Sequence, residues 1–211
     1  MKPVLFIGAL VSAGMGMSMS GVAINVASAS TPEKAVLAAG CFWGTEEFFR
    51  KIPGVLDTRV GYAGGSEFLK TTPSYESVSS GNTGYAESLE LKFDPQKISY
   101  ERLLTFFFEM HDPTTANRQG GDRGTQYRSA IFYESSEQKK IAEDVIKKIE
   151  LSKAWKAALT TQVAPVGKTF YPAEEEHQKY LVKHPGGYDN HFFRNLDFGS
   201  GLPRVSEPQK K

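Results

Sequence analysis

The chain contains a single cysteine, Cys41, and a thiol is among the strongest nucleophiles that a protein side chain offers. An apolar run of strand type at 35–39 ends at Gly40, and a helix is predicted over 45–51, so Cys41 lies at a strand-to-helix turn. Free backbone N–H groups and the positive end of the helix dipole stabilise a thiolate there, and we expect a lowered thiol pKa. The alternative is an inert cysteine that packs as a small apolar residue.

Phe42 and Trp43 follow the cysteine directly and predict an apolar wall beside it, although plain core aromatics would give the same sequence. Histidine is a common base for a cysteine nucleophile, and His177 lies on a helix predicted over 173–181. We expect His177 to make a supporting hydrogen bond instead, with Tyr180 as its partner. The four histidines show no spacing typical of metal ligands, so no metal site is predicted.

The elements that must position these residues alternate between strands and helices. Two segments, 66–84 and 111–128, are rich in turn-forming residues and are predicted to be loops, and Glu87 is placed at the entrance of the strand that follows the first. The whole order favours an α+β fold, a compact two-layer α/β sandwich with a mixed sheet around a split βαβ (ferredoxin-like) core. Strands are predicted at 35–39, 55–62, 88–93, 129–133 and 161–166, and helices at 45–51, 100–110, after Ser135 and at 173–181.

The first 29 residues differ from the rest of the chain. Lys2 is followed by no charged residue until Glu33, and an apolar stretch diluted by small residues ends in an A-x-A site at Ala29. This pattern predicts a secretory signal peptide over 1–29 that is cleaved near Ala29, and hence a secreted or periplasmic protein. The alternative is an uncleaved N-terminus that tethers the protein to a membrane.

The remaining residues, 30–211, are predicted to form a single catalytic domain with an irregular C-terminal tail from about residue 183. The formal net charge of the whole chain is +1, and removal of Lys2 with the leader makes the mature protein neutral. Such a balance, without a basic cluster, argues against nucleic acid as a partner. Cysteines in an oxidising compartment usually pair as disulfides, so the presence of an unpaired thiol there requires an explanation.

Four blocks of residues resemble the peptide methionine sulfoxide reductase A family, over about residues 34–188. Each block alone is moderately specific, but their common order leaves little room for chance. The resemblance implies a peptide-methionine (S)-S-oxide reductase, which reduces methionine S-sulfoxide, free or in proteins, to methionine. The blocks are Gly40-Cys41-Phe42-Trp43-Gly44, Gly61-Tyr62-Ala63-Gly64-Gly65, Asn117-Arg118-Gln119-Gly120 with Gly124-Thr125-Gln126-Tyr127-Arg128-Ser129, and Tyr171-Pro172-Ala173-Glu174 with His177-Gln178-Lys179-Tyr180.

The resemblance also implies catalytic roles. Cys41 corresponds to the nucleophile, whose thiolate attacks the sulfoxide sulfur and becomes a sulfenic acid. Glu87 corresponds to the acid that protonates the departing oxygen, and Tyr75 and Tyr127 to two tyrosines that assist it. An apolar pocket would keep Glu87 protonated near neutral pH, because burial disfavours the carboxylate.

Three further residues correspond to substrate-binding positions of the family. Phe42 and Trp43 would hold the substrate methyl group and keep the pocket dry, and Asp122 would contact the polar part of the substrate or a water. The resemblance implies no bound cofactor and no metal. Methionine sulfoxide and an external thiol reductant are the expected partners of a monomer.

The chain departs from the common family pattern at two places. Tyr85 stands where many members have a histidine before the catalytic acid. Many members also place a resolving cysteine directly after Gly-Tyr in the tail, and here Gly187-Tyr188 is followed by Asp189. The chain thus resembles the one-cysteine branch, whose sulfenic acid must be recycled by thioredoxin, glutaredoxin or a small thiol.

Two other functions remain open on the sequence. One is a secreted cysteine hydrolase that uses Cys41 and His177, and the other is a non-catalytic envelope protein that binds peptides beside Phe42 and Trp43. A hydrolase needs His177, a reductase oxidises Cys41 once per turnover, and a binder leaves the thiol unchanged.

Overall fold

The structure, a computed structural model, describes residues 31–65, 72–167, 170–199 and 201–203. The predicted signal peptide over 1–29 lies outside the described residues. Within the described part of the chain, no helix is both long and apolar enough to cross a membrane.

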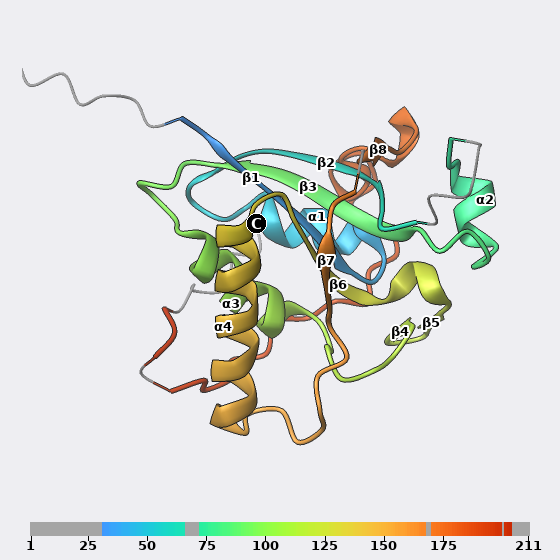
Figure 1. Ribbon diagram of the computed structural model, residues 1–211. Helices are drawn as coiled ribbons and strands as arrows, with labels where there is room; N and C mark the ends of the chain where they lie inside the picture. The colour runs from blue at the N-terminus through green and yellow to red at the C-terminus, as the bar shows by residue number, and fades with distance from the viewer. Residues whose placement is uncertain (1–30, 66–71, 168–169, 200, 204–211) are drawn as a thin grey trace, which may run out of the picture.

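A six-stranded mixed sheet with the order β7-β6-β1-β3-β2-β8 forms the centre of the fold (Figure 1). The pair β6·β7 is parallel, and the other neighbouring strands pair antiparallel. A separate hairpin consists of β4 (Arg118–Gln119) and β5 (Asp122–Arg123). The strands of the main sheet are β1 (Glu33–Ala39), β2 (Val55–Ala63), β3 (Ala86–Phe93), β6 (Ser129–Tyr133), β7 (Gln162–Pro165) and β8 (Tyr171–Pro172).

The connections between these strands form the predicted core. Helix α1 joins β1 to β2, and β3 inserts between these two parallel strands. Helix α3 then joins β3 to β6 on the other side of β1, which completes a ferredoxin-like arrangement and confirms the predicted α+β fold. The helices are α1 (Phe42–Phe49), α2 (Tyr75–Ser79), α3 (Tyr100–Met110), α4 (Ser136–Ser152) and α5 (Tyr180–Lys183), with 3-10 turns η1 (Thr125–Tyr127) and η2 (Glu175–His177).

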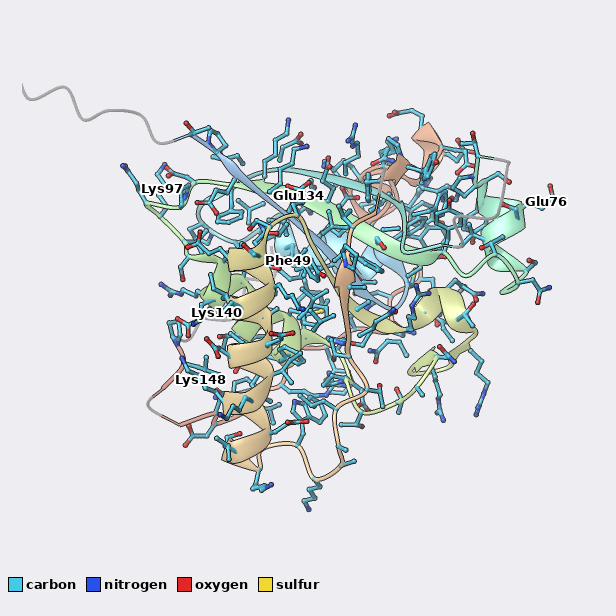
Figure 2. All side chains as sticks on the ribbon, viewed as in Figure 1. Phe49, Glu76, Lys97, Glu134, Lys140 and Lys148 are labelled. Carbon is cyan, nitrogen blue, oxygen red and sulfur yellow. The ribbon has the colours of Figure 1, made fainter. Side chains whose placement is uncertain are left out.

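The main core lies between the sheet and the helices. Alternate strand residues such as Leu37 and Leu89 pack with Phe49 of α1 on this face, and each large side chain buried there contributes about 1.5–3 kcal/mol. Figure 2 shows Phe49 in the interior, whereas Lys140 and Lys148 project from the exposed face of α4. The opposite face of the sheet carries a smaller cluster made largely of alanine.

Two predicted helices have different bounds. The helix expected over 45–51 begins already at Phe42, because Cys41 is an N-cap whose side chain accepts no hydrogen bond and so gives no capping signal. The helix expected over 173–181 is wrong: β8 ends just before that region, which contains η2 and only the start of the four-residue α5. Lys179 interrupts it in the left-handed conformation, with φ 55°.

Two smaller predictions also need correction. The segment 66–84, expected to be a loop, contains the helix α2, which is only five residues long and too short to show a helical period. Glu87, expected at the entrance of a strand, lies inside β3, which begins at Ala86.

The tail beyond Lys183 has no helix or strand in its described residues, yet it is not loose. Its side chains His191, Phe198 and Leu202 are buried, and the backbone N–H of Arg194 donates to the carbonyl of Glu109 in α3. The tail therefore packs against the helical layer next to α1.

Candidate active site

Cys41 is the N-cap of α1 and is 6% exposed, at the strand-to-helix turn where the sequence placed it. The first turn of α1 offers N–H groups that have no partner within the helix. The N–H of Phe42 donates to Glu87 Oε2 at 3.0 Å, and the N–H groups of Trp43 and Gly44 lie near the Cys41 thiol, where they act to lower its pKa. The first turn of α1 thus lies against both the Cys41 thiol and the Glu87 carboxyl.

The lowered thiol pKa expected at this position is wrong for the free protein. Burial raises the pKa of the Cys41 thiol far above its usual value, and the charge of Glu87 raises it further. The N–H groups of Trp43 and Gly44 do lower the pKa, as a helix N-terminus should, but burial outweighs them. Cys41 therefore keeps its proton at neutral pH in the free protein.

Glu87 is 2% exposed and lies in β3 directly across from Tyr62 of β2. Burial raises the pKa of its carboxyl to about 8, although the N–H of Phe42 opposes the shift, and the charge of Asp122 adds to it. Glu87 is therefore largely protonated at neutral pH, as the sequence analysis required of an acid.

Tyr75 begins α2 and Tyr127 ends η1, and both are half-buried. Burial raises the pKa of both phenols, and the charge of Glu87 raises each pKa further. Both tyrosines thus keep their protons at neutral pH and are hydrogen-bond donors close to Glu87. The structure brings together residues from β3, α2 and η1.

Phe42 is fully buried and Trp43 half-buried, with ring centroids 6.4 Å apart. The Trp43 ring stacks on Tyr180 at 3.8 Å, and its Nε1 donates to His177 Nδ1 at 3.3 Å. The predicted hydrogen bond between His177 and Tyr180 is therefore wrong, because His177 Nδ1 accepts its hydrogen bond from the Trp43 indole. Nor do the described contacts pair His177 with Cys41, as a hydrolase would need.

Asp122 lies in β5 and joins the hairpin to the tail. Its carboxylate accepts hydrogen bonds from Tyr188 Oη and Asn190 Nδ2, both at 2.8 Å. Its charge raises the pKa of the Cys41 thiol and of the Glu87 carboxyl, so it lies within electrostatic reach of both. No cluster of three or more metal-binding side chains is found among the residues that the structure describes.

The C-terminal tail also contacts the turn that carries Cys41. Asp189 accepts from His191 Nδ1 at 3.0 Å, and His191 Nε2 donates to the Ala39 carbonyl at 2.7 Å. A Cβ on Gly44 would come within 2.2 Å of both side chains. The tail therefore rests on the first turn of α1, and only glycine fits there.

The sequence analysis missed these contacts. Tyr62 and Glu174 occur inside motif blocks with no predicted role, and in the structure Glu174 accepts hydrogen bonds from both Tyr75 and Tyr62. His191 entered the sequence analysis only as one of the four histidines whose spacing predicts no metal site. The only sequence signal of a role for Tyr62 and Glu174 was their position inside a motif block. No sequence signal indicated a role for His191.

A buried thiol, a protonated acid hydrogen-bonded to the same helix turn, and two phenols, all positioned by an α+β fold, define a class of enzyme. They suit a thiol-dependent oxidoreductase that removes a poorly leaving oxygen from a small apolar group. Comparison with known proteins narrows the class to one family.

The family model for peptide methionine sulfoxide reductase matches residues 33–197. The peptide methionine sulfoxide reductase MsrA of Mycobacterium ulcerans is 49% identical over 175 residues, which cover 83% of this chain and 96% of the relative. MsrA 2 of Rhodopirellula baltica is 52% identical over 162 residues, which cover 77% and 92%. The chain belongs to the peptide methionine sulfoxide reductase MsrA family, and its reaction is the reduction of methionine S-sulfoxide.

Solved structures agree with this assignment. The chain is similar to reduced Mxr1 from Saccharomyces cerevisiae, with a TM-score of 0.72, 41% identity and coverage of 78% of this chain and 93% of that one. It is also similar to methionine sulfoxide reductase A of Corynebacterium diphtheriae, with a TM-score of 0.69, 35% identity and coverage of 82% and 83%. Mxr1 has also been solved in complex with Trx2, and that chain has a TM-score of 0.52, 28% identity and coverage of 82% and 97%.

Proposed function

We propose that Cys41 is the nucleophile and Glu87 the acid of this reductase. The observation that carries the proposal is the hydrogen bond from Phe42 N to Glu87 Oε2, which fixes a buried, protonated acid on the helix turn that begins with the thiol. An acid in this place protonates the sulfoxide oxygen, which is a poor leaving group without a proton.

The reaction is a two-electron oxygen transfer. Glu87 gives its proton to the sulfoxide oxygen, and its carboxylate takes the thiol proton, so Cys41 attacks the sulfoxide sulfur as a thiolate. This attack forms an S–S bond, after which the S–O bond of the substrate breaks and releases hydroxide. The hydroxide attacks the Cys41 sulfur, which becomes a sulfenic acid, and the S–S bond breaks with its electron pair on the substrate sulfur, which leaves as methionine. The acid ends the step protonated, ready for another turn.

The remaining site residues bind the substrate. Tyr75 and Tyr127 donate hydrogen bonds to the oxygen, Phe42 and Trp43 hold the methyl group, and Asp122 contacts the polar part of the substrate or a water. The chiral sulfur then presents its lone pair to Cys41 in one hand only, for free or protein-bound methionine sulfoxide.

The test is to mix the protein with racemic methionine sulfoxide and follow both epimers, methionine and free thiol. The S epimer should disappear, the R epimer should remain, and one thiol should be lost per methionine formed without reductant. Equal consumption of both epimers would contradict the proposed pocket.

We further propose that the sulfenic acid on Cys41 is recycled by an external thiol in a one-cysteine cycle. The chain has no second cysteine, and Asp189 occupies the position of the usual resolving thiol. The complex of the related Mxr1 with Trx2 favours thioredoxin over glutaredoxin or a small thiol. One turnover without reductant should leave a Cys41 that reacts with dimedone, and thioredoxin should restore the free thiol faster than glutathione does.

Export of the protein is proposed on the leader pattern alone. The family match begins at residue 33, after the predicted cleavage site near Ala29. N-terminal sequencing of protein recovered from the periplasm or medium should begin near Ser30, whereas a membrane-bound chain that still contains Lys2 would support the tether. A single catalytic domain is expected to run as a monomer in sedimentation.

A further inference from the structure

Glu174, a carboxylate near the end of the chain, contacts two tyrosines beside the site. Its Oε1 accepts the backbone N–H of Tyr75 at 2.8 Å, and its Oε2 accepts the hydroxyl of Tyr62 at 2.8 Å. The partners lie 99 and 112 positions away in sequence, so this link is tertiary. The three residues connect β2, α2 and the segment between β8 and η2.

Helix α2, which carries Tyr75, is too short to fix its own orientation. It has five residues, far fewer than an isolated helix needs, and of these only Val78 is buried. Glu76 points outward from it (Figure 2). The Ser74–Ser77 capping box fixes the local turn but contacts no other element. The direction in which α2 presents Tyr75 therefore depends on contacts from outside the helix.

Glu174 is itself held by the sheet. Its neighbour Ala173 donates its N–H to the Val60 carbonyl at 3.0 Å, and the Gln178 side-chain amide bonds both the N–H and the carbonyl of Val60 at 2.9 Å. The fully buried Tyr62 fixes the other carboxylate oxygen to β2. The Glu174 carboxylate thus fixes the first turn of α2 relative to strand β2.

We propose that Glu174 is the positioning residue that sets Tyr75 against the substrate oxygen, by tying the first turn of α2 to β2 through Tyr62. The inference rests on the proposed donor role of Tyr75. Glu174 acts on the reaction only through this tyrosine and touches neither substrate nor thiol.

The charge of Glu174 strengthens the link. Burial pushes the pKa of its carboxyl upward, but the N–H of Tyr75, the N–H of Glu174 itself, the hydroxyl of Tyr62 and the charge of His177 together outweigh burial and lower the pKa below its usual value. The carboxylate is therefore ionised at neutral pH, and hydrogen bonds to an ionised acceptor are about twice as strong as neutral ones. Tyr62 must also donate toward Glu174, since a carboxylate has no proton to give.

The test measures single-turnover methionine formation by Glu174→Ala, Tyr75→Phe and the double variant. Glu174→Ala should lower the rate constant by about 10- to 100-fold with little change in KM, because a small displacement of a donor costs rate more than binding. In the Tyr75→Phe background, the same change should cost less than about 2-fold. Glu175→Ala, which removes a neighbouring carboxylate that is 89% exposed, is the matched control and should leave the rate unchanged.

Glu174→Gln keeps the proposal testable if Glu174→Ala fails to fold. The amide oxygen can still accept from Tyr75 N, while its NH₂ faces Tyr62, so about a third or more of the rate lost in alanine should return. Independent losses in the double variant, or a glutamine variant no better than alanine, would overturn the positioning role. An inactive wild-type protein would instead overturn the proposed function, and wild-type activity in Tyr75→Phe would overturn the donor role on which the inference rests.

Discussion

The nucleophile and the acid are held in a different way from the donors that surround them. Cys41 and Glu87 lie at the start of an eight-residue helix and within an eight-residue strand paired on both sides. Tyr75, Tyr127 and Asp122 lie on elements of five, three and two residues. The first pair depends on secondary structure and core packing, and the second group on single side-chain hydrogen bonds.

This difference separates chemistry from positioning. Removing a residue of the first region removes a reacting group or its proton, which costs orders of magnitude in rate. Loosening the second region displaces a donor and costs a smaller factor. If variants of the second region lowered the rate more than variants of the first region, the phenols, and not the acid, would make the main contribution to catalysis.

The largest effect is expected from Cys41→Ser. A serine hydroxyl does not ionise at neutral pH and is a far weaker nucleophile toward sulfur, so methionine formation should fall to background. Chromatography of the products measures it, and an unchanged circular dichroism spectrum is the control for folding. Measurable turnover by this variant would assign the reaction to another group.

Glu87→Gln should come next, with a single-turnover rate lowered by roughly 10²- to 10⁴-fold, the range typical of general acids. Binding of the substrate should persist, because the amide fits the same space. Glu90→Gln is the matched control, since Glu90 lies on the same strand but on its opposite face, where it pairs with Arg59 at 2.7 Å. Equal losses in both variants would point to damage of β3 and not to a lost acid.

The pH profile should report the protonation of Glu87. The acid is active when protonated, and its pKa is raised to about 8, so the rate constant should be level below that pH and fall about tenfold per unit above it. The phenols of Tyr75 and Tyr127 do not titrate there, because their pKa values are raised. A rate that instead rises with pH and levels off above 8 would show that Cys41 reacts from a preformed thiolate.

Much of the first region could be predicted from the sequence. Helix α3 follows from its apolar period and its cap at Ser99, which accepts from Arg102 N at 3.2 Å. The placement of Cys41 follows from a strand and a glycine ahead of a helix. Its pKa could not be predicted, because the helix N-terminus is visible in the sequence while the depth of burial is a tertiary property.

The second region could be predicted only as far as the family resemblance reached. The resemblance named Tyr75 and Tyr127 but gave no reason for their placement. The contacts that place them join residues from distant parts of the chain, such as Thr125 Oγ1, which donates to the Gly81 carbonyl at 2.7 Å. No local pattern encodes such a contact, since hydrogen bonds across a fold leave no period in sequence.

A smaller effect is expected from Gln126→Ala, which releases the other end of α2. Gln126 Nε2 donates to the Ser79 carbonyl at 3.1 Å, and a neutral bond of this kind contributes about 0.5–1.5 kcal/mol, or roughly 2- to 10-fold in rate. The matched control is Gln138→Ala, whose Nε2 donates to the Lys34 carbonyl at 2.7 Å away from the site. A loss of rate in Gln126→Ala as large as that in Glu87→Gln would contradict the proposed difference between the two regions.

The smallest change in rate is expected from Asp189→Cys, which alters the fate of the product and not its formation. Asp189 rests against Gly44 in the first turn of α1, and Cys41 is the N-cap of that helix, so a thiol at 189 lies beside the same helix turn. Methionine formation should change by less than about threefold, because the proposed nucleophile Cys41 and the proposed acid Glu87 are both left in place. The sulfenic acid should condense with the new thiol to an internal disulfide, and dimedone should no longer label Cys41. Asp197→Cys, further along the same tail, is the control and should leave the dimedone adduct in place. An Asp189→Cys protein that still reacts with dimedone as the parent does would show that His191 and its neighbours hold the tail too rigidly for position 189 to reach the nucleophile.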